Sequence, residues 1–288
     1  MNTQEAERWT SEVLDEVFEA LAASEEITSA LVFKGARVLR KRLDSAYRQS
    51  TDIDSNLLED FAGQLEDRLA QAQYLQKHAT VAIQRYFNRQ DPIRYELTDI
   101  RAKLKPQSEH PMGWNAIELR LSVKDLAKPS VRAFPALVID VAAPEELLKT
   151  SIAPLMIGEN AVQAYTLERL AGEKLRAFLS SLPAYQMKMR RRGNTIRVKD
   201  IYDLAVVGTV RPLEQRDFWH QVGQEFQTAC RSRFIDCAGL ATFEEGLERT
   251  RKTYESDPTL PKDVHFDEAW AFLRGVVQLF EDIKLLPF

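Results

Sequence analysis

The spacing of apolar side chains predicts alternating helices and strands in the first half of the chain. Across residues 5–24, apolar side chains recur at i, i+3 and i+4, which predicts an amphipathic helix. Residues 29–35 form a compact apolar run ending in glycine, which predicts a buried strand and a turn, and residues 36–43 resume helical spacing. A second strand is expected from residue 51, and a long helix over residues 58–79.

Three further strands are predicted before the pattern becomes helical. Runs rich in β-branched and apolar residues, separated by Pro, Gly or charged breaks, cover residues 92–104, 114–123 and 135–143. A short strand-like run then leads into a helix for which Thr166 is the expected N-cap. A second helix is expected over residues 197–207.

The remaining residues, 211–288, have a helical pattern throughout, with Thr242 and Glu245 spaced as a capping box. The chain is therefore expected to have an α+β fold with a mixed sheet and a C-terminal helical region. We expect a core domain over residues 1–145, a helical segment over residues 146–210, and a helical bundle over residues 211–288.

Composition and charge exclude several classes of protein. A chain of 288 residues that is 44% hydrophobic can bury a large core, and its net charge of −4 argues against a protein that coats nucleic acid. Its longest apolar runs are too short to span a membrane, and its N-terminus is polar and acidic, so we expect a cytoplasmic protein with no membrane partner. The two cysteines, Cys230 and Cys237, predict reduced thiols and no zinc site.

The segment from Gly35 to Asp54 suggests metal and phosphate chemistry. On a strand, Asp52 and Asp54 point the same way about 6 to 7 Å apart, where Mg²⁺ or Mn²⁺ would relieve the repulsion of their carboxylates. Gly35 and Ala36 open a helix whose free N–H groups suit phosphate oxygens. The alternatives are a solvated strand end and a simple turn glycine.

Later residues add candidates for the same chemistry. Asp140 ends an apolar run and could be a third metal-binding carboxylate, or else a strand-end cap. Lys174 lies on a predicted helix, and a second helix carries Arg197, Lys199, Asp200 and Asp203, which could equally form a surface ion-pair cluster. A basic stretch could bind an RNA acceptor or remain a solvated loop; it contains Lys188, Arg190, Arg191 and Arg192.

Taken in order, these motifs resemble a known family. Five motifs follow one another over roughly residues 28–206. They are KGARVLR, R-x-S-x-D-I-D, a late strand aspartate, LERLAGEKLRA and R-x-K-D-I-Y-D-L. This order is similar to that of the AbiEii-like nucleotidyltransferase toxins of type IV toxin–antitoxin systems. The family usually has Gly-Gly or Gly-Ser where this chain has Gly35-Ala36, so the hydroxyl is missing while the N–H remains.

The resemblance implies a polymerase-beta-like nucleotidyltransferase fold, with residues assigned as follows. Asp52 and Asp54 would bind the metal, with Asp140 matching the third carboxylate by strand position only. Lys174 would contact the triphosphate, and Asp200 or Asp203 would complete the active centre. The nucleotide-binding residues would be Lys34, Gly35, Ala36, Arg48, Ser50, Lys174, Arg197 and Lys199.

The implied activity is metal-dependent transfer of a nucleotide from a nucleoside triphosphate to RNA, tRNA included, or to a protein. The resemblance also implies a separately encoded antitoxin. Two alternatives from other classes remain: a catalytically silent module of the same fold that binds RNA or protein, and a metal-dependent phosphohydrolase or nuclease. Retention of all the candidate carboxylates favours the enzyme, because a binding module has no need of them.

Overall fold

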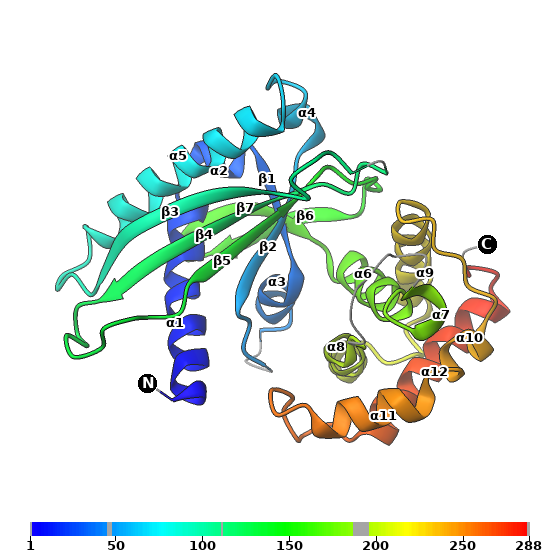
Figure 1. The fold of residues 1–288 in the computed structure, drawn as a ribbon. Coiled ribbons are helices and arrows are strands. Elements are labelled where there is room, and N and C mark those ends of the chain that lie inside the picture. Colours follow the sequence, from blue (N-terminus) through cyan, green and yellow to red (C-terminus); the bar gives the residue numbers. More distant parts are fainter. Residues whose placement is uncertain (1, 45–47, 111, 187–195, 287–288) are drawn as a thin grey trace. The chain divides into compact units, whose positions relative to one another are not determined.

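The computed structural model describes residues 2–44, 48–110, 112–186 and 196–286 (Figure 1). The chain forms two compact units. The first contains Met1–Lys41, Gln49–Glu145 and Ala153–Ala164, and the second contains Arg42–Arg48, Glu146–Ile152 and Tyr165–Phe288. Within the described ranges, no helix has both the length and the apolar character needed to cross a membrane.

The first unit is built on a seven-stranded mixed sheet with the order β3-β4-β5-β2-β1-β7-β6 (Figure 1). Strands β2 and β5 are parallel, as are β1 and β7, whereas β1–β2, β3–β4 and β4–β5 are antiparallel. The strands are β1 (Leu31–Lys34), β2 (Asp52–Leu57), β3 (Tyr95–Lys105), β4 (Ala116–Asp125), β5 (Leu137–Ala142), β6 (Ile152–Ile157) and β7 (Asn160–Tyr165).

Strand β4 has one apolar face and one mainly polar face. On β4, Leu119, Leu121 and Val123 are buried while the side chains between them are exposed, which is the alternation of a strand covered on one side. Helix α5 packs on β3 and also contacts α1, which packs on β2. The helices of this unit are α1 (Thr3–Ala22), α2 (Glu25–Thr28), α3 (Gly35–Arg42), α4 (Glu59–Ala62) and α5 (Arg68–Phe87).

The second unit is helical over its described C-terminal residues. Helix α6 packs between α8 and α9, and α12 also packs on α8, around buried aromatic residues such as Phe178, Trp219 and Phe226. At Gly172 of α6, an added Cβ would lie 2.7 Å from the backbone nitrogen of Phe226, so glycine allows the close approach of α9. The helices are α6 (Leu167–Leu179), α7 (Pro183–Gln186), α8 (Val198–Val210), α9 (Arg216–Arg231), α10 (Leu240–Glu244), α11 (Leu247–Ser256) and α12 (Phe266–Asp282).

Three local expectations differ from the structure. The helix predicted over residues 58–79 is interrupted between α4 and α5, and α5 continues to Phe87. The short strand-like run expected before Thr166 is β7, but the structure adds β6 before it, in a hairpin whose two-residue turn begins at Gly158 with φ of +57°. The prediction of a capping box at Thr242 and Glu245 is wrong, because Thr242 lies inside α10 and the N-cap of α11 is Gly246.

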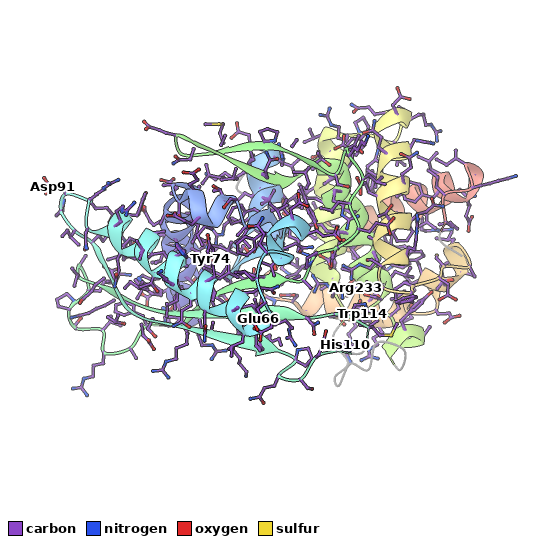
Figure 2. All side chains as sticks on the ribbon, turned by 90° about the horizontal axis from the view of Figure 1, so that it is seen from above. Glu66, Tyr74, Asp91, His110, Trp114 and Arg233 are labelled. Atoms are coloured by element: carbon purple, nitrogen blue, oxygen red, sulfur yellow. The ribbon has the colours of Figure 1, made fainter. Side chains whose placement is uncertain are left out.

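The loop between β3 and β4 is held by its own side chains. The rings of His110 and Trp114 stack with centroids 5.1 Å apart (Figure 2). The His110 backbone N–H donates to the Asn115 side chain at 2.9 Å, and the Asn115 carbonyl accepts from Ala143 N–H at 2.8 Å. These contacts join the end of the hairpin to the end of β5.

Candidate functional site

The predicted acids of the first unit lie on the polar face of the sheet. Asp54 is in register with Lys34 on β1 and with Asp140 on β5. Residues directly opposite each other on paired strands share a face, so these side chains form one row across the sheet. Asp52 lies two residues before Asp54 and therefore on the same face, while Ile53 between them is buried on the other.

The turn after β1 lies directly against Asp54. Gly35 has φ of +80°, and a Cβ added there would lie 2.0 Å from Asp54 Oδ2. Any larger residue would have to displace that carboxylate and would also be strained by the positive φ. The turn places the start of α3, with Ala36 as its second residue, beside the acidic row.

A buried arginine that sequence reasoning missed positions Asp52. Arg37 is paired with Asp15 of α1 and donates to the Ser50 carbonyl at 3.0 Å. The Ser50 hydroxyl in turn donates to Asp52 Oδ1 at 3.0 Å. Burial lowers the pKa of Arg37, and the Asp15 carboxylate opposes that effect. No local motif marks this arginine, since its partners are distant in sequence.

Two more residues were missed at Asp140. Glu118 of β4 is in register with Asp140, and Lys105 of β3 makes ion pairs with both carboxylates. Burial raises the pKa of Asp140, and the attraction of Lys105 only partly opposes it. The hydrogen bond from Lys105 lowers the pKa of Glu118. The strand alternation of residues 114–123 places Glu118 on the polar face, a signal available in the sequence.

The carboxylates of the first unit suit a hard divalent cation whose remaining ligands come from water and substrate. Among the described residues, no three Asp, Glu, His or Cys side chains form a ready-made metal site. Mg²⁺ commonly uses only one or two protein carboxylates, with water and substrate phosphates as its other ligands. Asp52 and Asp54 share a face, and the Asp54 carboxylate lies against the Gly35 turn, where a Cβ would displace it.

The second unit gathers five of the predicted residues into one ion-pair cluster. The Lys174 ammonium on α6 contacts Asp203 and lies 3.4 Å from Asp200 Oδ1, both on α8. Arg48 donates to Asp203 through two nitrogens, at 2.8 and 2.7 Å, and Arg197 pairs with Asp200. This bidentate geometry is typical of strong Arg–carboxylate pairs.

This cluster is buried, so it is not the surface ion pair considered from the sequence. Lys174, Asp200 and Asp203 are 7%, 1% and 3% exposed. Burial alone would raise the pKa of Asp203, but Lys174 and Arg48 outweigh it and lower the pKa to about 2. Asp200 likewise has a lowered pKa, because Arg197 and Lys174 outweigh the effect of burial.

The elements that hold this cluster follow the sequence closely. Thr166 caps α6, since its hydroxyl accepts from Arg169 N–H, and this confirms the predicted N-cap.

The remaining predicted cations are not part of this cluster as described. Lys199 lies on α8 and is partly exposed. The basic residues proposed to contact RNA lie outside the described residues; these are Lys188, Arg190, Arg191 and Arg192.

Comparisons with known proteins bear on the fold. Solved structures that cover nearly the whole chain include the following two. One is JHP933 from Helicobacter pylori, at 13% identity and TM-score 0.56, covering 99% of this chain and 94% of that one. The other is MenT4, the nucleotidyltransferase toxin Rv2826c from Mycobacterium tuberculosis H37Rv, at 17% identity and TM-score 0.52, covering 96% and 86%. These likenesses establish a nucleotidyltransferase fold.

A family comparison goes further than the fold. Among curated proteins, no match to the sequence was found. Residues 19–278, however, match the family described as "Nucleotidyl transferase AbiEii toxin, Type IV TA system". Because that match covers most of the chain, this protein belongs to the AbiEii family of nucleotidyltransferase toxins.

Proposed function

We propose that this nucleotidyltransferase uses Mg²⁺ or Mn²⁺ to transfer a nucleotide from a nucleoside triphosphate to an RNA acceptor, tRNA included. It would act as a toxin opposed by a separately encoded antitoxin. The observation that carries the proposal is the pairing of Asp54 and Asp140 in register on parallel strands, with the Gly35 turn against Asp54. A protein that only binds RNA has no use for this arrangement of carboxylates.

The metal would be held by Asp52, Asp54 and Asp140, and would offset phosphate charge and favour ionisation of the attacking hydroxyl. Ser50 orients Asp52 through its hydrogen bond, and Arg37 fixes the Ser50 backbone. Backbone N–H groups at the start of α3 bind phosphate oxygens, which the partial positive charge of a helix N-terminus favours.

Lys174 is the first cation proposed for the nucleotide. The ammonium of Lys174, oriented by Asp200 and Asp203, contacts the triphosphate and offsets charge developing on the pyrophosphate leaving group. The remaining cations proposed for the nucleotide are Lys34, Arg48, Arg197 and Lys199. The acceptor contacts the basic stretch of residues 188–192, whose sequence can neutralise several phosphates.

The deciding experiment follows the label of each nucleoside triphosphate in turn, with Mg²⁺ and total RNA. Transfer joins an acceptor hydroxyl to the α-phosphorus and releases pyrophosphate, so an α-phosphate label should enter RNA and a γ-phosphate label should not. Chelation of the metal should stop incorporation. Label in protein would indicate a protein acceptor instead, and release of free phosphate without incorporation would contradict nucleotidyl transfer.

Replacing Gly35 with alanine should lower turnover by about a hundredfold, because the added Cβ displaces the Asp54 carboxylate. Gly113→Ala is the matched control. Gly113 also has a positive φ, of +69°, but a Cβ there meets nothing within 4 Å. That variant should lose about 1 kcal/mol of stability and keep its turnover. Equal turnover in the two variants would show that the contact with Asp54 is unimportant.

A further inference from the structure

The third carboxylate of the row already has a cation of the protein beside it. Lys105 Nζ lies 3.4 Å from Asp140 Oδ1 and is in closer contact with Glu118. The Lys105 side chain is 42% exposed, whereas that of Glu118 is 7% exposed. Glu118 is therefore a buried anchor, and Lys105 is the accessible member of the pair.

The backbone holds Lys105 in this place. Lys105 pairs with Ala116 at the last rung of the β3–β4 ladder, so Glu118 is its diagonal neighbour on the same face. Arg68 of α5 donates to the Pro106 carbonyl at 2.9 Å, and the stack of His110 on Trp114 holds the loop that follows. The ammonium therefore reaches Asp140 from a fixed strand end.

An ammonium and a divalent cation at one carboxylate repel each other and compete for the same negative charge. We propose that Lys105 is a built-in counter-ion of Asp140, which a divalent cation must displace, so that it weakens metal binding in the absence of nucleotide. This inference rests on the proposed function, since it takes Asp140 as a metal ligand. Lys105 acts on the metal through Asp140 and is thus a positioning residue.

Glu118 gives the displaced ammonium a place to remain. When Lys105 leaves Asp140, it keeps its ion pair with Glu118, whose buried carboxylate also pairs with Arg120 at 3.5 Å. Displacement by the metal then breaks the contact of Lys105 with Asp140 and leaves its contact with Glu118 intact. The metal-free site would carry less repulsion among its carboxylates, and the cation would bind most tightly when triphosphate oxygens complete its ligands.

Direct titration with Mn²⁺, followed by electron paramagnetic resonance without nucleotide, tests the proposal. Lys105→Gln should tighten Mn²⁺ binding by about tenfold, because the opposing charge beside Asp140 is removed. Lys103→Gln is the matched control, since Lys103 lies on the same strand and face, in register with Glu118, and is exposed to solvent. It should change the affinity by less than about twofold because of screening.

Two further variants separate this effect from misfolding and from general electrostatics. Lys105→Arg keeps the charge and should leave Mn²⁺ affinity within about twofold of wild type. In an Asp140→Asn background, Lys105→Gln should likewise change Mn²⁺ affinity by less than about twofold. The carboxylate for which Lys105 and Mn²⁺ compete is then absent. Equal affinities for wild type, Lys105→Gln and Lys103→Gln would overturn the inference, even if nucleotide transfer is normal. Absence of both transfer and Mn²⁺ binding in wild type and Lys105→Gln would overturn the proposed function as well.

Discussion

Asp54→Asn should lower nucleotide transfer at least about a thousandfold, the largest effect expected from a single substitution in this chain. The amide has nearly the same shape as the carboxylate, so the contact with the Gly35 turn is preserved. What is lost is the negative charge in register with Asp140 that would bind the cation. Asp52→Asn should behave similarly, although its hydrogen bond from Ser50 can be kept by the amide oxygen.

Asp99→Asn provides the control for both substitutions. Asp99 lies on β3, in the same sheet, where it pairs with the exposed Arg101. The Asp99→Asn variant should keep its turnover, because Asp99 is not among the proposed site residues. It should also keep its stability, since exposed ion pairs contribute at most about 1 kcal/mol. Melting temperatures of all three variants should stay close to wild type. If Asp54→Asn transferred nucleotide at a normal rate, the metal assignment on β2 would have to be abandoned.

The second large effect is expected for Lys174→Met, which should reduce turnover by roughly a hundredfold or more at saturating triphosphate. It should also reduce stability by about 3 kcal/mol, because the buried carboxylates of Asp200 and Asp203 lose a shared cation. Loss of activity alone would therefore not prove contact with the triphosphate. Lys174→Arg keeps the charge and should recover most of the stability, but only part of the turnover, since its planar group places charge differently.

A double variant separates the two roles of Lys174. Lys174→Met with Asp200→Asn removes one charge of each sign, and Arg197, whose side chain is half exposed, can turn to solvent. Asp203 keeps its bidentate pair with Arg48. The free energy of unfolding, measured with urea, should recover while turnover stays low. Recovery of both would mean that Lys174 serves the fold only.

How much of this could be predicted depends on whether a signal was local or distant. Alternation predicted the strands, and the Thr166 cap predicted where α6 begins, because those features need only neighbouring residues. The helical spacing of Lys199 and Asp203 suggested a local ion pair. In the structure, Asp203 binds Lys174 and Arg48 instead, partners supplied by chain segments far away in sequence.

The same limit explains the residues that were missed. Arg37 looks like one basic residue of a helix, and only the fold shows that it joins α1 to the Ser50 backbone. Lys105 and Glu118 meet because β3 and β4 pair in one particular register, which periodicity does not specify. Strand β7 matches the short strand-like run expected before Thr166, whereas β6 was missed because it is short and lacks a clear alternation.

The close approach of Gly35 to Asp54 has a consequence for how relatives diverge. Because the carboxylate fills the space where a side chain would start, the two positions constrain each other. A descendant that no longer needs Asp54 and replaces it with a smaller residue also loses the steric reason for glycine, leaving only the preference set by the positive φ. We therefore expect Gly35 to vary more among relatives that have lost Asp54 than among those that keep it, where both the contact and the positive φ require glycine.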